Sequence, residues 1–215
     1  MVIFYKKFKA STITKYNPII KHKPENYIKL QNSSRPLILE CKKRIDLLMK
    51  EQNIKKISIL DICCASGRHL NALYEFYGNK IEYNGFDINK KNKKLMKKNF
   101  FSLYKNSTIK YLDIKKFYII NKKKFNISFC HGRSLDLVKP NFNLVKYICK
   151  STLNYVILIN ISNENNSFQR FWDYEFCIYG FKLIKNLFPE SSYSKLEVKG
   201  NNRKHFFKVY KKIYK

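Results

Sequence analysis

The sequence predicts a doubly wound α/β fold with a mostly parallel sheet, and two observations carry this prediction. A buried strand at 57–62 runs into a stretch of small residues and then into a helical pattern. The next two strand-like runs each end in an acid, Asp87 and Asp113. With 215 residues, of which 45% are hydrophobic, the chain is long enough for one well-buried domain and short for two.

Each element follows from its own pattern of apolar residues. Leu37 to Met49 carries apolar residues at helical spacing, and Gly78 supplies the stop of a second helix. The expected elements are, in order, a helix at 35–52, a strand at 57–62, a helix at 68–77, a strand at 81–87, a helix at 88–100, strands at 108–114, 125–130 and 154–161, a helix at 168–179, and two or three strands after residue 180.

The loop after the first strand is the candidate cofactor seat. Its small residues, among them Cys63, Ala65 and Gly67, let the backbone approach a ligand closely, and the following helix start presents unpaired N–H groups. A nucleotide-binding unit places an acid about 20 residues further on, at the tip of the second strand, where it accepts hydrogen bonds from the ribose. Asp87 has this position.

The loop segment, DICCASG, resembles the D-x-G-x-G-x-G motif of class I S-adenosylmethionine (SAM) dependent methyltransferases. Asp61 and Gly67 match, whereas Cys63 and Ala65 stand in the other two glycine places and would be strained at positive φ. The resemblance implies a Rossmann-like class I methyltransferase sandwich, whose mostly parallel seven-stranded sheet has an antiparallel last strand and binds SAM across the carboxyl ends of its strands.

The resemblance also implies a set of cofactor contacts. Asp113 would accept from the adenine amino group, although a single strand-end aspartate is often a helix N-cap. Arg35 would bind the cofactor's carboxylate, as in the glycine N-methyltransferase-like branch, or be a surface arginine. The full set of expected SAM-binding residues is Arg35, Asp61, Cys63, Ala65, Gly67, Asp87, Ile88, Asp113, Ile114 and Cys130.

The fourth strand runs into the phrase CHGRSLDLV, which is similar to the C-x-G-N-S-L pattern of glycine and sarcosine N-methyltransferase-like enzymes, with Arg133 in place of asparagine. The catalytic candidates are Arg133, Ser134 and His131. Arg133 suits a carboxylate or phosphate of the acceptor, and His131 is able to take a proton from the incoming nucleophile. Structural roles for this arginine and histidine are the alternative.

The formal net charge of +29 has two readings. Only six of the 44 basic residues are arginines, so genome composition explains the lysine excess as well as nucleic-acid binding does. The six cysteines have no metal-ligand spacing, and we expect reduced thiols and no metal. No signal-peptide or membrane-spanning pattern is present, which favours a cytoplasmic protein without membrane contact.

The domain expectation is a basic arm or lid at 1–34 and a methyltransferase domain at 35–215, with organelle targeting as the alternative for the acid-free first 24 residues. The functional expectation is SAM-dependent methyl transfer to a small amine or amino-acid-like metabolite. RNA methylation is one alternative, and a non-catalytic basic binding module on the same scaffold is the other. The sequence leaves the oligomeric state open.

Overall fold

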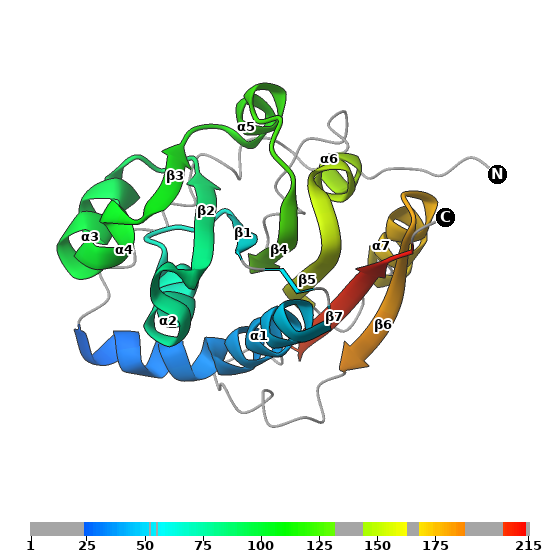
Figure 1. Ribbon diagram of the computed structural model, residues 1–215, viewed down its shortest axis with the longest axis horizontal. Coiled ribbons are helices and arrows are strands. Elements are labelled where there is room, and N and C mark those ends of the chain that lie inside the picture. The colour runs from blue at the N-terminus through cyan, green and yellow to red at the C-terminus, as the bar shows by residue number, and fades with distance from the viewer. Residues whose placement is uncertain are drawn as a thin grey trace.

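The computed structural model describes residues 24–51, 53–54, 56–131, 144–162, 168–187 and 204–213, and it has helices on both faces of one sheet (Figure 1). The strands are β1 (Ile57–Ile62), β2 (Ile81–Asp87), β3 (Ser107–Tyr111), β4 (Phe125–His131), β5 (Thr152–Ser162), β6 (Phe181–Leu187) and β7 (Lys204–Lys212). The helices are α1 (Pro24–Glu51), α2 (Arg68–Tyr77), the 3-10 turn η2 (Gly78–Lys80), α3 (Lys91–Asn99), α4 (Phe101–Lys105), α5 (Ile114–Ile120), α6 (Leu144–Ser151) and α7 (Phe168–Ile178).

The sheet has the order β3-β2-β1-β4-β5-β7-β6. Strands β1 to β5 pair in parallel, and β7 is antiparallel to both β5 and β6. This confirms the predicted mostly parallel seven-stranded sheet with an antiparallel last strand. Because β1 lies between β2 and β4, the carboxyl ends of these three strands lie side by side at one edge of the sheet.

The side chains on the two faces of β1 belong to two different hydrophobic clusters. Ile57 and Ile59 pack in the cluster that contains the apolar residues of α1, α2 and α3, whereas Leu60 and Ile62 pack in the cluster under α5, α6 and α7. All six residues of β1 are buried, as a central parallel strand covered on both faces requires. The mostly aliphatic run of β1, in which only Ser58 and Asp61 are polar, therefore places the loop after β1 in the middle of the sheet edge.

Three expectations about elements were wrong or incomplete. Helix α1 begins at Pro24 instead of residue 35 and continues through the expected domain boundary. The third strand ends at Tyr111, because Asp113 caps α5, a helix that the pattern did not predict. Helices α4 and α6 were also not predicted. One of the strands expected after residue 180, over residues 193–200, lies outside the described residues.

An ion-pair cluster holds α1 against the sheet. The Arg44 guanidinium binds Glu40 one helical turn away, and the Lys185 ammonium from β6 lies 2.6 Å from the other oxygen of Glu40. Burial raises the pKa of Glu40, but the hydrogen bonds and charges of Lys185 and Arg44 outweigh it and leave the pKa below its usual value. Within the described part of the chain, no helix combines the length and the apolar character needed to cross a membrane.

Candidate cofactor site

The loop between β1 and α2 passes through the left-handed backbone region three times. The φ angles are 60° at Cys63, 48° at Ala65 and 78° at Gly67. These are the three positions that are glycine in the motif that the loop resembles. The backbone therefore keeps a glycine-type path although two of the three residues carry a Cβ, at a cost of about 1–2 kcal/mol per residue.

Hydrogen bonds from β2 hold this path in place. The Cys64 N–H donates to the carbonyl of Phe86 at 2.9 Å, and the Ala65 N–H donates to Oδ2 of Asp87 at 2.9 Å. Cys64 also packs on Gly85, where a Cβ would lie 3.0 Å from the Cys64 sulfur. The sequence analysis missed Gly85, yet a glycine inside a strand is the usual signal of such a close approach.

Relief of the strain at Ala65 gives a first prediction. Ala65 is exposed, so Ala65→Gly removes the left-handed penalty without loss of packing, while the freer unfolded chain offsets part of the gain. We expect the free energy of unfolding to rise by about 0.5–1 kcal/mol in chemical denaturation. Ala72→Gly, in the interior of α2, is the control and should lose about 1 kcal/mol. A decrease in the free energy of unfolding for both variants would contradict the idea that Ala65 is strained.

Asp61 is a buried carboxyl group without a hydrogen-bond donor. Its side chain is 1% exposed, and neither oxygen has a hydrogen-bond partner among the described residues. Burial, and then the negative charge of Asp87, raise its pKa well above the usual value, against the opposing effect of Arg68. Such an oxygen in a native protein calls for a water, an ion or a ligand.

His69 is the nearest titratable neighbour of Asp61. Its Nδ1 lies 3.7 Å from Oδ2 of Asp61, and its ring packs edge-on to Phe129 of β4. Burial, with the charge of Arg68, lowers the pKa of His69 to about 3, so the imidazole is neutral at neutral pH. The contact is therefore not a carboxylate–imidazolium ion pair.

Asp87 lies beneath the loop as the 20-residue spacing predicted, but it has several donors already. Its Oδ2 accepts from Ala65, and its Oδ1 accepts from the Asn89 N–H at 2.8 Å and from the Asn92 side-chain amide at 3.2 Å. A carboxylate offers about four lone-pair sites. A bidentate grip on a ribose would therefore require the Asn92 side chain to move. Asn92 belongs to no recognised motif, and nothing in its sequence context indicated this contact.

The remaining predicted contacts differ in burial. Ile88, directly after β2, is 72% exposed, which leaves an apolar side chain at the rim of the loop. Asp113 caps α5, because its Oδ1 accepts from two backbone N–H groups of the first turn. Ile114 is half-buried and Cys130 is buried, both in the cluster below α5. Cys130 lies in register with Ile62 at the end of β1.

The side chains of four predicted site residues lie outside the part of the chain that the structure describes. Arg35 belongs to α1 and His131 ends β4, but their side chains lie outside the described ones. Arg133 and Ser134 lie wholly outside the described residues. The structure therefore brings together the cofactor half of the predicted site, around β1 and β2.

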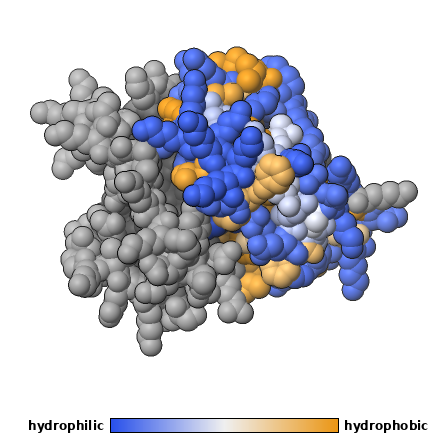
Figure 2. Space-filling model, turned by 90° about the vertical axis from the view of Figure 1, so that its left-hand side faces the viewer, coloured by the Kyte–Doolittle hydropathy of each residue, from blue (hydrophilic) through white to orange (hydrophobic). Residues whose placement is uncertain are grey.

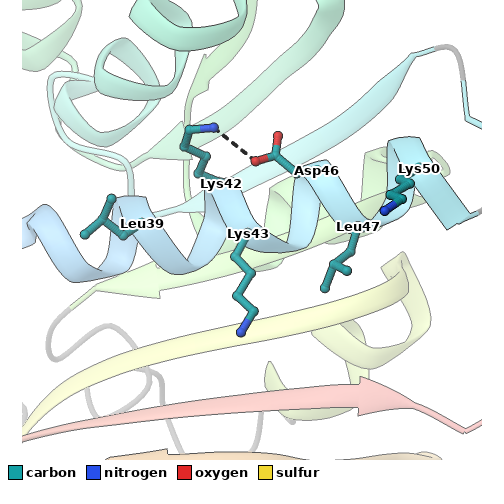
Figure 3. A pocket seen from close by; sticks show the side chains of 6 residues that line it. All are labelled: Leu39, Lys42, Lys43, Asp46, Leu47 and Lys50. Atoms are coloured by element: carbon teal, nitrogen blue, oxygen red, sulfur yellow. Dashed lines mark hydrogen bonds and ion pairs between the residues drawn. The ribbon is translucent and has the colours of Figure 1, made fainter.

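A depression of about 350 Å³ lies elsewhere, on the outer face of α1 (Figure 3). All six of its lining residues come from that helix, and an ion pair between Lys42 and Asp46 spans part of it. None of them belongs to the loop or to the strand ends around it. Across the described residues, no group of three or more His, Cys, Asp and Glu side chains is arranged to hold a metal ion.

Comparison with known proteins identifies the fold. No family model and no curated protein sequence matches the chain. Among solved structures, a candidate sarcosine dimethylglycine methyltransferase from Galdieria sulphuraria aligns with a TM-score of 0.61 at 12% identity, over 85% of each chain. A magnesium protoporphyrin IX methyltransferase from Synechocystis, solved with bound SAM, aligns with a TM-score of 0.59 at 10% identity, over 86% of this chain and 82% of that one.

A candidate RNA methyltransferase from Pyrococcus horikoshii aligns with a TM-score of 0.58 at 12% identity, over 80% of this chain and 82% of that one. The chain has the class I methyltransferase fold. The three proteins act on different acceptors. At 10–12% sequence identity to this chain, they show similarity of fold only.

The residues around the loop fit SAM in two respects. A left-handed loop path leaves backbone close to the ligand space, as the cofactor of this fold requires. The orphaned Asp61 carboxyl group suits the ammonium group of the cofactor's methionine part, directly or through water, since a cation is the partner that a buried acid lacks.

Proposed function

We propose that this chain is a SAM-dependent methyltransferase. The observation that carries the proposal is the retained glycine-type path of the loop 63–67 above a buried, donor-free carboxyl group at Asp61. Both features cost stability in the absence of a ligand. A scaffold that had become only a basic binding module would have no reason to keep a strained loop at this place.

In the proposed mechanism, the bound cofactor supplies an electrophilic methyl group on its sulfonium. Asp61 offsets the cationic end of the cofactor, and Asp87 holds the loop through Ala65 and contacts the ribose. The adenosine part of the cofactor is positioned by Asp113, by Ile88 and by the backbone of the loop 63–67. Most of the rate then comes from proximity and in-line alignment, because the positive charge disperses in the transition state.

For the acceptor, we propose a small amine or amino-acid-like metabolite. The support is the C-x-G-x-S-L pattern after β4, in which Arg133 would bind an acceptor carboxylate, Ser134 would orient the acceptor, and His131 would take the proton released by the attacking nitrogen. RNA is the second candidate acceptor. It is favoured by a separate observation, the uneven distribution of lysine over the surface.

The test is calorimetric titration of the protein with SAM and with S-adenosylhomocysteine. We expect micromolar binding that Asp87→Ala weakens at least tenfold, because both the loop anchor and a ribose contact are lost. Asn92→Ala is the matched control: it removes a competitor for the same carboxylate and should leave the affinity equal or higher. An absence of binding at millimolar ligand would leave the non-catalytic module as the function.

A screen of acceptors then separates the two candidates. For a small amine, Arg133→Ala should spare SAM binding and abolish turnover. If the same change weakened SAM binding as much as Asp87→Ala, Arg133 would belong to the cofactor half of the site. Turnover on RNA with none on amines would reverse the order of the two candidates.

A further inference from the structure

We propose that the β3 edge of the molecule is a binding surface for single-stranded nucleic acid. This lysine edge comprises α3, α4, β3 and the start of α5. The inference goes beyond the proposed function, because it concerns a surface that lies outside the loop 63–67 and does not depend on methyl transfer.

Charge is concentrated in this part of the chain. Residues 88–124 contain thirteen lysines and a single acid, Asp113. Helix α3 and its N-cap carry six of these lysines, all exposed, and no acid. The six are Lys90, Lys91, Lys93, Lys94, Lys97 and Lys98. No described acid forms an ion pair with any of them.

Helix α1 of the same chain does not share this pattern. Residues 37–51 of α1 contain three acids and four basic residues, and Lys42 and Arg44 pair there with Asp46 and Glu40. A genome-wide lysine bias would raise the lysine content of both helices alike. The difference between them therefore needs a local reason, and a polyanionic partner is one.

Three of the α3 lysines lie along one side of the helix. Lys91, Lys94 and Lys98 follow the spacing of one helix stripe, about 10 Å long. Helices α3 and α4 lie beside β3 at one end of the sheet (Figure 1). From that side the described surface is mainly hydrophilic, with separate hydrophobic residues between the charges (Figure 2). This mixture is unlike a plain solubilising face.

An exposed aromatic residue among the lysines specifies the form of the nucleic acid. Phe101, the first residue of α4, is 48% exposed, and the Lys105 ammonium lies 4.6 Å from its ring centroid. Aromatic rings among basic residues bind unpaired bases by stacking, whereas the bases of a duplex are already stacked. An acidic protein segment would use the charges without the ring. The combination favours a single strand.

The test uses fluorescence anisotropy with a labelled 20-nucleotide single-stranded RNA, the same DNA sequence, an RNA duplex, and poly-glutamate. A quadruple variant changes Lys91, Lys94, Lys97 and Lys98 to Gln. The control changes four exposed lysines of α1, β6 and β7 to Gln, and thus removes the same charge: Lys43, Lys50, Lys182 and Lys211. Circular dichroism and SAM titration verify that both variants fold and bind cofactor equally.

We expect the α3 variant to lose at least tenfold in affinity for the single strands and to reduce the slope of log K against log salt by about 3, while the control changes affinity less than threefold. Phe101→Ala should weaken single-strand binding at least threefold and leave poly-glutamate unaffected. Equal losses in both lysine variants, or tighter binding of poly-glutamate or duplex than of single strands, would overturn the proposal. A failed SAM titration would instead contradict the methyltransferase function.

Discussion

Asp61→Asn is expected to stabilise the cofactor-free protein and to weaken SAM binding. The wild-type carboxyl group is buried without a donor, and Asp87 adds its negative charge nearby. Replacement by a neutral amide removes the cost of a buried charge, and we expect a gain of about 1–3 kcal/mol in the free energy of unfolding at pH 8. SAM affinity should fall at least tenfold, because the cationic end of the cofactor loses its acid.

The pH dependence identifies the group. The folded-state pKa of Asp61 lies above its unfolded value, so its contribution to stability is complete below about pH 4 and is lost as the pH rises through the folded pKa. The advantage of Asp61→Asn over the wild type should therefore grow with pH in urea titrations between pH 4 and 8.

Asp113→Asn is the matched control for this experiment. It removes the same formal charge and keeps an N-cap oxygen for α5, so stability should change by less than about 0.5 kcal/mol at every pH. A stability of Asp61→Asn that equals the wild type at pH 8 would mean that the carboxyl group has a partner in solution. The idea that Asp61 lacks a hydrogen-bond donor until a ligand binds would then be wrong.

The sequence predicted the part of the site that depends on strand periodicity. The run ISILDI correctly predicted β1, and the run IEYNGFD correctly predicted β2 with Asp87 as its last residue. Because these two strands pair in parallel, the end of β2 lies beside the end of β1, and Asp87 therefore contacts the loop 63–67. The positive φ angles at Cys63 and Ala65 followed from the resemblance, since residue types alone would have argued against them.

The rest depends on tertiary contacts that leave weak marks in a sequence. Asp113 looked like the end of a strand, because a seven-residue helix with three β-branched isoleucines resembles a strand. The donors of Asn92 and Asn89 to Asp87 depend on how α3 meets β2. Lys208 is one of four lysines in β7, and nothing in that sequence indicated that its side chain points inward, because lysine is rarely buried.

Asp173→Ala is expected to have the largest effect on stability. The Lys208 ammonium of β7, whose side chain is 3% exposed, lies 2.7 Å from Oδ2 of Asp173 on α7, and the Tyr210 hydroxyl donates to Oδ1 at 2.5 Å. Removal of the acid leaves a buried cation without its facing carboxylate and a phenol without its acceptor. We expect a loss of about 3–5 kcal/mol in the free energy of unfolding.

The control for Asp173→Ala is Glu82→Ala, which breaks the pair that Glu82 forms with Lys123 at the surface. Both side chains of that pair are more than a third exposed, and we expect a loss below about 1 kcal/mol. Lys208→Met in the Asp173→Ala background should recover much of the loss, because an apolar chain of similar length replaces the buried cation. If Asp173→Ala cost no more than Glu82→Ala, solvent would have to reach Lys208, and α7 would not be fixed on β7.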